Sequence, residues 1–166
     1  MLIDPLRNLP GYALRRASLA VMGQLARRLA KMDLRPTEAS VLVVIAANPG
    51  ITQSEVGQLL EIARANMTPL AARLHDRNLI VRARVDGRSH GIRLSAAGRQ
   101  LTRKVRQAMT ENEAALMDRI PRADHAAFLQ ALQALWIPEV VKSGPCDPVK
   151  DQKPAKRAAK MRFARE

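Results

Sequence analysis

Three residues that can hydrogen-bond to the edges of DNA bases lie close together in the middle of the chain: Arg64, Asn66 and Thr68. An arginine side chain can bond both acceptors of a guanine, and an asparagine side chain can bond adenine through two contacts. The first residues of a helix that enters the major groove make contacts of this kind. Arg73 lies further along the same segment and is a fourth candidate for a DNA contact.

A second group of polar residues surrounds the dipeptide Asp86-Gly87, which is a signal for the turn of a β-hairpin. Around this turn lie Arg84, Arg88, Ser89 and His90. An arginine on a narrow projection suits the minor groove, where the negative potential is strongest over A·T-rich steps. We therefore predict that Arg88 contacts DNA from the hairpin tip, together with these neighbours.

The positive charge of the chain is concentrated around these two groups. The 166 residues include 28 Lys and Arg against 15 Asp and Glu, a net charge of +13. Residues 64–106 hold eleven of the basic residues and two of the acidic ones, whereas the rest of the chain up to residue 137 holds nine of each. Such a local excess indicates a polyanionic partner, and a basic protein without one is the alternative.

Several helices and one hairpin are needed to position these residues, and the spacing of apolar residues predicts where they lie. Helices are expected over residues 12–32, 37–47, 53–61, 64–77, 96–119 and 123–136. Residues 79–94 change to a rough alternation of apolar and basic residues, which predicts strands over 80–85 and 90–94. The expected fold is therefore mainly α with a small β-hairpin that must pack on the helices, because two strands alone are marginal.

Local signals mark the ends of these helices. Thr52 and Glu55 have the spacing of a capping box. Ser95 is expected to cap the helix that follows it, and Asn78 suits a left-handed residue after a helix. Pro69 falls inside the helix expected over residues 64–77, where it removes one backbone hydrogen bond and favours a kink or a break.

The order of these elements predicts how the chain is organised. A helix-turn-helix followed by a hairpin is a winged helix-turn-helix, expected over residues 33–98 within a domain of residues 1–137. The flanking helices, residues 12–32 and 99–137, have more apolar surface than a small DNA-binding unit needs, and a second copy would bury it. Residues 138–166 form a basic, proline-containing tail that is expected to be flexible, with helix formation on DNA as the alternative.

Composition restricts the compartment. Cys146 is the only cysteine and lies in this tail, so no disulfide can form within the chain and a reducing compartment is expected. The sequence has no run of 18 apolar residues, and its first residues lack the pattern of a secretory signal. We therefore expect a cytoplasmic, nucleoid-associated protein with no membrane partner.

Catalysis is not expected from this sequence. Paired carboxylates, a Ser-His-Asp set, a metal cluster and a glycine-rich phosphate loop are all missing at a useful spacing. His75, His90 and His125 do not have the spacing of zinc ligands, so structural or surface roles are expected for them. The sequence accordingly predicts neither a cofactor nor a bound metal.

Two motifs around the predicted hairpin are similar to those of a known family. Asp86-Gly87-Arg88 resembles a D-x-R pattern, and the residues 92–98, IRLSAAG, resemble a following L-[TS]-x-x-G pattern. Residues 34–50, which end in a Pro-Gly turn, also look like a helix of that family. From about Tyr12 to Trp136 the sequence thus resembles the MarR (multiple antibiotic resistance regulator) family.

This resemblance implies a homodimeric transcription regulator that binds a palindromic operator in double-stranded DNA, usually as a repressor. It places Arg88 in the minor groove and gives Asp86 a salt bridge that braces the hairpin, the wing of the fold. It also places the segment from Arg64 to Thr68 in the recognition helix. Two departures concern that helix: Ala63 stands where members often have a capping Ser or Thr, and Pro69 where many have a basic residue.

The resemblance further implies a small-molecule effector. Such proteins commonly release DNA when a small anion or a phenolic compound binds between the winged domain and the dimerising helices. We expect a phenolic, aromatic-acid or acyl-CoA-like ligand in a cleft lined from the first, second and fifth helices, with the candidates Tyr12, Arg15, Arg16, Met22 and Met109. A solvated helix face for the arginines and a core position for the methionines are the alternative interpretations.

A different class of function is compatible with the same composition. A non-specific, architectural nucleic-acid-binding protein would also have a basic tail and a pI of about 11.3. Such a protein would not distinguish an operator-like palindrome from random DNA at moderate salt.

Overall fold

The computed structural model describes residues 4–86 and 89–135, and for residues 83–90 only the backbone. Contacts between Cα atoms divide the chain into one unit of residues 1–125 and another of residues 126–166. This division falls at the start of the last helix. The domain boundary that the sequence predicts after residue 137 therefore stays a prediction.

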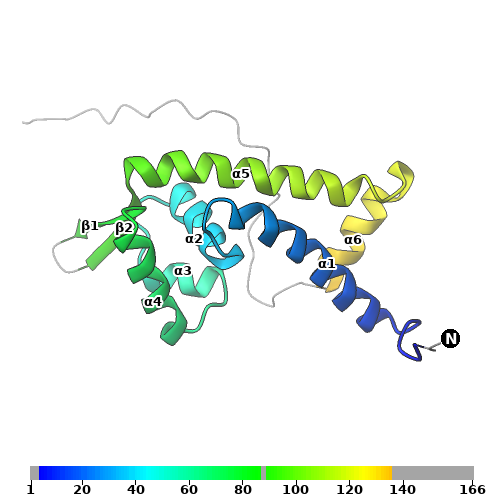
Figure 1. Cartoon of the computed structure of the whole chain (residues 1–166). Helices are drawn as coiled ribbons and strands as arrows, with labels where there is room; N and C mark the ends of the chain where they lie inside the picture. Colours follow the sequence, from blue (N-terminus) through cyan, green and yellow to red (C-terminus); the bar gives the residue numbers. More distant parts are fainter. Residues whose placement is uncertain (1–3, 87–88, 136–166) are drawn as a thin grey trace, which may run out of the picture. The chain divides into compact units, whose positions relative to one another are not determined.

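The described part of the first unit has the mainly α fold with one hairpin that the sequence predicts (Figure 1). In chain order its elements are α1 (Pro10–Ala30), α2 (Pro36–Ala47), α3 (Gln53–Leu59), α4 (Arg64–Asp76), β1 (Ile80–Asp86), β2 (Ser89–Leu94), α5 (Ala96–Met117) and the 3-10 helix η1 (Arg122–Asp124). The last helix, α6 (His125–Leu135), has no buried residue. Each predicted helix is found, with its ends shifted by a few residues at most.

Helix α2 is the buried centre of this unit, as its run of apolar residues predicts. Val41, Leu42 and Ile45 are all fully buried. Helix α5 packs along both α1 and α2 and adds Val105 to the same core. Because α2 is covered on several sides, an apolar residue is needed at nearly every one of its positions.

The hairpin is joined to the helices through the free edge of β2. Strand β1 pairs with β2 in antiparallel register, with Arg82 opposite Ile92 and an irregularity between Arg84 and Asp86. On the other edge, the Ile92 N–H donates to the Ile51 carbonyl at 2.9 Å, and the Gly50 N–H donates to the Ile92 carbonyl at 3.0 Å. These bonds connect the wing to the turn between α2 and α3, so the hairpin does not stand alone.

The predicted helix caps are confirmed. The Thr52 N–H donates to the Glu55 carboxylate at 2.8 Å, and the Glu55 N–H donates to the Thr52 hydroxyl at 3.2 Å. The Thr52 hydroxyl also donates to the Glu55 carboxylate, at 2.8 Å. The two bonds that the carboxylate accepts, first from the Thr52 N–H and then from the Thr52 hydroxyl, hold the pKa of Glu55 below its ordinary value of 4.5. The Ser95 hydroxyl accepts from the Gly98 N–H, and Asn78 has a left-handed φ of 58°.

The start of α5 lies directly against the end of α4. The Ser95 N–H donates to the Leu79 carbonyl at 3.0 Å, and the Ser95 hydroxyl donates to the Asn78 carbonyl. A Cβ atom added to Gly98 would fall on the carbonyl oxygen of Leu79 and would lie 2.9 Å from its carbon. Only glycine therefore allows α5 to approach the chain this closely.

Two further observations concern the described residues alone. Within residues 4–86 and 89–135, no helix combines the length and the apolar character needed to cross a bilayer. In the same ranges, no group of three or more His, Cys, Asp and Glu is arranged to hold a metal ion. The expectations for Trp136, Cys146 and the basic tail fall outside the residues that the structure describes.

Candidate nucleic-acid interface

Helices α3 and α4 form a tight helix-turn-helix. Glu61 reverses the chain between them with a left-handed φ of 52°, and the Ile62 N–H donates back to the Gly57 carbonyl at 2.8 Å. A Cβ atom at Gly57 would lie 3.1 Å from the Ile62 carbonyl oxygen, so the missing side chain permits the close turn. This geometry sets the direction in which α4 leaves α3.

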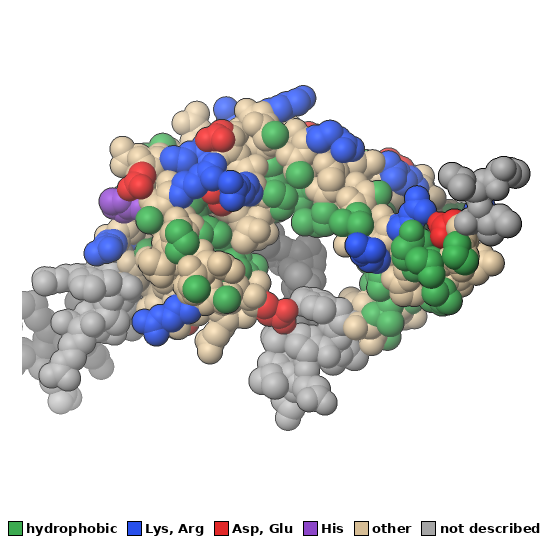
Figure 2. All heavy atoms as spheres, turned by 60° about the horizontal axis from the view of Figure 1, so that its bottom comes forward, with side chains coloured by type: hydrophobic (Ala, Val, Ile, Leu, Met, Phe, Trp, Pro, Cys, Tyr) green, Lys and Arg blue, Asp and Glu red, His purple; other side chains and the backbone are tan. Residues whose placement is uncertain are grey.

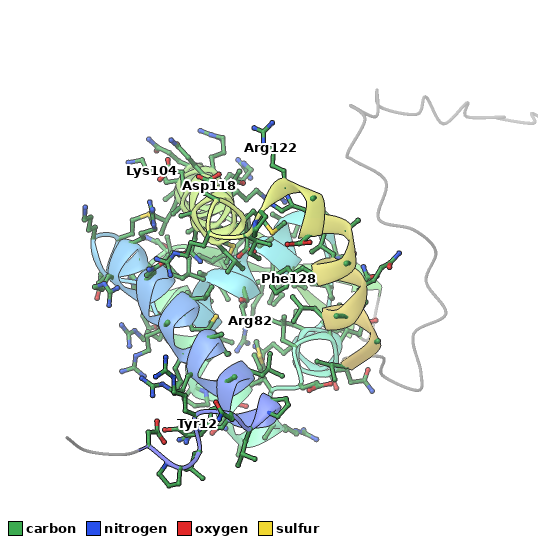
Figure 3. The ribbon with its side chains drawn as sticks, turned by 90° about the vertical axis from the view of Figure 1, so that its right-hand side faces the viewer. Tyr12, Arg82, Lys104, Asp118, Arg122 and Phe128 are labelled. Carbon is green, nitrogen blue, oxygen red and sulfur yellow. The ribbon has the colours of Figure 1, made fainter. Side chains whose placement is uncertain are left out.

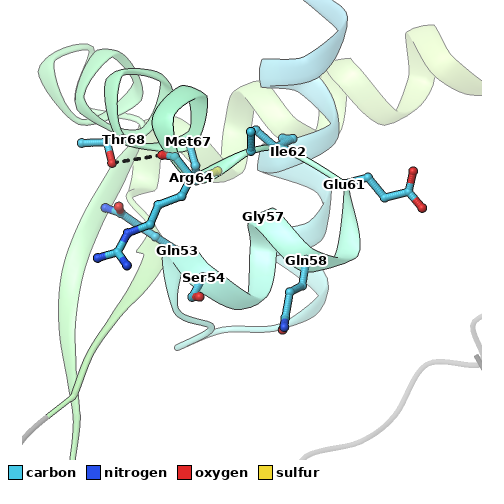
Figure 4. A pocket seen from close by; sticks show the side chains of 10 residues that line it. Gln53, Ser54, Gly57, Gln58, Glu61, Ile62, Arg64, Met67 and Thr68 are labelled. Carbon is cyan, nitrogen blue, oxygen red and sulfur yellow. Dashed lines mark hydrogen bonds between the residues drawn. The ribbon is translucent and has the colours of Figure 1, made fainter. Parts of the chain in front are cut away.

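A cleft of about 600 Å³ separates α3 from the first turns of α4 (Figure 4). Arg64 and Thr68 line it from α4, and Gln53, Ser54 and Gln58 line it from α3. The Arg64 side chain extends toward the side of the cleft where Gln53 lies. The sequence predicted the two α4 residues but did not single out Gln53 and Ser54, which belong to the first turn after the Thr52 cap.

The start of α4 has no side-chain cap, as the alanine at position 63 predicts. Ala63 makes no capping bond, and the first turn of α4 carries no acidic residue. The backbone N–H groups of Arg64 and Ala65 therefore lack the intrahelical acceptors that later residues have, and the positive end of the helix dipole is not neutralised. Such an end suits a negatively charged group.

Helix α4 continues through Pro69 without a break. The missing N–H of this residue leaves the Ala65 carbonyl without its usual intrahelical donor. The Pro69 ring lies on an exposed side of α4, away from its buried residues Met67, Ala71 and Leu74. An exposed position lets the carbonyl be hydrated, which explains why the helix tolerates the proline.

The structure divides the four predicted α4 residues between two sides. Arg64 and Thr68 line the cleft next to α3, whereas Asn66 and Arg73 line a different cleft of about 610 Å³ between α4 and the start of α2. Positions 64 and 68 lie one above the other on a helix, and position 66 points to another side. Arg64 and Thr68 therefore share one side of α4 and Asn66 lies on another. The base contacts predicted for the three residues stay predictions.

Arg73 is engaged by acidic side chains of the protein itself. Its Nε lies 3.1 Å from a carboxylate oxygen of Glu38, and its Nη2 lies 3.8 Å from Asp33. Glu38 is only 3% exposed, and its other oxygen accepts from the Arg35 N–H at 2.8 Å. A buried carboxylate needs such a partner, so the geometry favours a structural role for Arg73. The DNA contact predicted for this residue stays a prediction.

Arg77, directly after α4, adds to the contacts that Arg73 makes with the turn between α1 and α2. Arg77 Nη2 lies 3.5 Å from the Asp33 carboxylate and donates to the Met32 carbonyl at 3.2 Å. Its Nη1 donates to the Asp33 carbonyl. The left-handed φ of Asp33, 50°, turns the chain so that both its backbone and its side chain face the arginines. The end of α4 is thus bound to the turn between α1 and α2.

The wing residues with predicted roles lie where side chains are not described. These are Arg84, Asp86, Arg88, Ser89 and His90. Their predicted contacts, including the salt bridge of Asp86, stay predictions. At the root of the wing, Arg82 and Arg93 are exposed and described.

Charges on this side of the molecule are mixed. Figure 2 shows Lys and Arg side chains at several places on the face that comes forward, some of them next to Asp and Glu side chains. The net charge of a segment therefore does not say which of its cations is available to a partner. Each arginine has to be assessed by its own contacts.

The five ligand candidates lie on two helices, α1 and α5, and their predicted roles stay predictions. Tyr12 lies near the start of α1 (Figure 3), and Arg15 and Arg16 follow on the next turn. The Arg16 guanidinium is 5.8 Å from the Tyr12 ring centroid and 3.3 Å from Asp4. Met22 is exposed further along α1, and Met109 packs against the core from α5. None of these five residues lines the clefts described for this part of the chain.

A further group of polar residues includes three arginines of α5 that were not singled out from the sequence. A groove at the root of the wing, between α2, β2 and α5, is lined by Arg93, Arg99, Arg103 and Arg106. Arg99, Arg103 and Arg106 are spaced four and three residues apart, so the sequence places them on one side of a helix. In the sequence they are part of the local excess of positive charge.

Comparison with known proteins gives consistent matches. The model of the MarR family matches residues 32–89. A curated protein of Thauera aromatica, assigned as a transcriptional regulatory protein for the hcr operon, is 26% identical over 129 residues, which are 76% of this chain and 78% of that protein.

Solved structures match over a longer part of the chain. The transcriptional repressor CouR bound to a 23-mer DNA duplex is 33% identical with a TM-score of 0.72, and the match covers 81% of this chain and 97% of CouR. CouR bound to p-coumaroyl-CoA is 32% identical with a TM-score of 0.71, covering 81% and 96%. The PcaV regulator of Streptomyces coelicolor, at 22% identity and a TM-score of 0.65, shares the fold over 81% of this chain and 96% of its own.

Proposed function

The chain belongs to the MarR family, and from this membership we propose that it is a transcriptional repressor that binds a palindromic operator and that a small ligand releases from DNA. The observation that carries the proposal is the helix-turn-helix with an uncapped, acid-free start of α4 beside the exposed Arg64. This site lies in a chain similar to a repressor whose structure contains a DNA duplex.

The proposed interface has two parts. Arg64 and Thr68, with Gln53 and Ser54 of α3, face the major groove, and Arg88 enters the minor groove from the wing tip. Contacts to phosphates would supply most of the affinity and make it strongly dependent on salt, and each good bidentate base contact would add about 1–3 kcal/mol of discrimination. The free N–H groups at the start of α4 support a phosphate contact there.

Operator binding can be tested with two substitutions, Arg88→Ala and Arg64→Ala. The probe is a DNA duplex with the palindrome that lies nearest to the promoter next to this protein's own gene. Binding is measured by gel-shift titration at fixed salt. We expect each variant to bind about tenfold more weakly. Arg64→Ala loses a bidentate major-groove contact worth about 1–3 kcal/mol, and Arg88→Ala loses the attraction of a guanidinium to the minor groove. Thermal unfolding should show that both variants stay folded.

Lys104→Ala is the matched control, because it removes one positive charge from the exposed face of α5 (Figure 3). Its affinity for the operator should equal that of the unchanged protein. If Arg88→Ala bound the operator as tightly as the unchanged protein, the proposed DNA contact of Arg88 would be wrong. Equal affinity of the unchanged protein for the palindrome and for random DNA would favour a non-specific architectural protein instead.

We also infer a homodimer formed by residues 12–32 and 99–137. Leu14, Leu19 and Met22 are 43%, 62% and 46% exposed on α1, so an apolar strip is left for a partner helix. Light scattering at micromolar concentration should give twice the mass of 18.3 kDa. A monomer would contradict this interface and, with it, the palindromic operator.

The effector is proposed to be a phenolic, aromatic-acid or acyl-CoA-like compound. Support comes from CouR, which has a structure with p-coumaroyl-CoA. A thermal-shift screen of aromatic acids and their coenzyme A thioesters would identify a candidate, and the same compound should then release the operator in a gel shift. A compound that stabilises the protein without releasing DNA would not be an effector.

A further inference from the structure

The groove at the root of the wing has an apolar floor and a basic rim. Its volume is about 320 Å³, and its floor is made by Ile45, Ala46 and Pro49 at the end of α2 and by Leu94 of β2. Its polar lining comes from Thr102 and four arginines. Because the Thr102 hydroxyl already donates to the Gly98 carbonyl at 2.7 Å, the arginines are the groups left to bind a ligand. We call this feature the wing-root groove.

The four arginines are Arg93 of β2 and Arg99, Arg103 and Arg106 of α5. The last three stand at spacings of four and three residues, so like charges are neighbours on one side of the helix, an arrangement that destabilises a helix on its own. All four are exposed. Repulsion of this kind is relieved when an anion binds between the guanidinium groups.

The protein does not neutralise this cluster within the residues that the structure describes. None of the four arginines takes part in the ion pairs formed there. Strand β2 has no acidic residue, and α5 has none before Glu111, which is paired with Arg28 at 2.8 Å. The one acidic residue of α2, Glu38, lies at the other end of that helix and binds Arg73.

The contrast with Arg73 and Arg77 is informative. Those arginines have a buried carboxylate or backbone carbonyls as partners, whereas the wing-root arginines have one such bond, from Arg99 Nη1 to the Leu94 carbonyl at 3.1 Å. The groove also shares no lining residue with the cleft between α3 and α4. Its charge is thus part of neither the internal anchor nor the helix-turn-helix surface.

We propose that the wing-root groove is a binding site for a small phosphate-bearing molecule with at least two negative charges. Guanidinium groups bind phosphate oxygens bidentately, and several arginines around one groove match a diphosphate better than a single carboxylate. The apolar floor would contact a non-polar part of the same molecule. The proposal does not rest on the proposed repressor function, because it uses only the lining of the groove and the contacts of its arginines.

Inorganic pyrophosphate is the probe, titrated calorimetrically into the full-length protein at constant ionic strength. The variant is Arg103→Gln with Arg106→Gln, which spares the Arg99 bond to Leu94. The control is Lys104→Gln with Arg119→Gln, which makes the same charge change on and after α5 without touching the groove. Thermal unfolding without pyrophosphate should show both double variants folded, with the groove variant no less stable because like charges are removed.

We expect pyrophosphate to bind the unchanged protein and the control equally, and the groove variant at least about tenfold more weakly, since each lost charge-assisted bond is worth about that factor. Mant-ADP, whose binding is followed by fluorescence, should give the same order of affinities for the three proteins. It also carries an apolar group that could contact the floor of the groove. Absence of binding to the unchanged protein would overturn the proposal. An equal loss in the control would overturn it too, because it would indicate attraction by net charge alone.

Discussion

The two ends of α4 are held in opposite ways. At its start, Ala63 makes no capping bond and the first turn is exposed. At its end, Arg73 and Arg77 bind Glu38, Asp33 and the Met32 carbonyl, while Ser95 holds the residues that follow the helix. The recognition helix is therefore fixed to the core at the end away from its candidate base contacts and left open at the end that carries them.

This difference shows how one helix can be both rigid and available. Backbone groups at a helix start that bind no side chain can bind a phosphate, but they add nothing to the stability of the free protein. The anchor at the other end supplies the missing rigidity. Helix α3 provides the comparison within the same protein, because Thr52 and Glu55 cap its start.

The largest expected effect comes from breaking the fixed end at Gly98. Gly98→Ala places a methyl group on the Leu79 carbonyl, and since backbone must move to accommodate it, we expect a loss of about 3 kcal/mol in the free energy of unfolding. Urea denaturation measures this value. The matched control is Gly23→Ala inside α1, where the nearest atom is 3.8 Å away, and it should stabilise the protein by about 0.5–1 kcal/mol.

A smaller loss is expected from Glu38→Ala. This change leaves the Arg35 N–H without its acceptor and leaves the Arg73 guanidinium with only the more distant Asp33, so we expect the free energy of unfolding to fall by about 2 kcal/mol. Glu38→Gln keeps an acceptor for Arg35 and should cost less. An unfolding curve of Glu38→Ala that coincides with that of the unchanged protein would mean that Arg73 does not depend on Glu38.

Closing the open end should have the opposite sign. In Ala63→Ser a hydroxyl can accept from an N–H group of the first turn of α4, and we expect a gain of about 1 kcal/mol in stability. If these N–H groups bind a DNA phosphate, the same variant should bind the operator more weakly in spite of its greater stability. Unchanged operator affinity would mean that the uncapped N–H groups of α4 do not contribute to DNA binding.

The smallest expected effect concerns the pH dependence of the α3 cap. Hydrogen bonds from Thr52 lower the pKa of Glu55 below 4.5 in the folded state, so its stabilising contribution is complete above that pH and is lost as the pH falls through the lowered pKa. Glu55→Gln should therefore be less stable than the unchanged protein at neutral pH, with a difference that shrinks in acid. Thermal unfolding of both proteins across this pH range provides the test, and a constant difference would contradict it.

Much of the site follows from local sequence. The capping box at Thr52, the left-handed Asn78, the cap at Ser95 and the bare start at Ala63 each depend on residues within four positions, and each is confirmed. Element order and the mainly α fold follow likewise, because apolar periodicity depends on neighbours along the chain. The family resemblance, carried by the wing motifs, is confirmed by the comparisons.

Contacts between distant residues could not be obtained in this way. Arg73 is 35 positions from Glu38, and nothing near it in sequence distinguishes it from Arg64, although one is paired with a buried carboxylate and the other lines an open cleft. Helical spacing places Asn66 on a different side of α4 from Arg64, but only the packing shows that this side faces the start of α2.

The sequence by itself thus determined which segments fold into which elements, how their ends are capped and where positive charge accumulates. The tertiary structure alone decided which of those charges are already used. A helix start is governed by bonds within one turn, whereas the availability of an arginine depends on which carboxylates the packing brings within about 4 Å of it. That is why Ala63 could be interpreted from the sequence, while the roles of Arg73 and of the wing-root arginines required the fold.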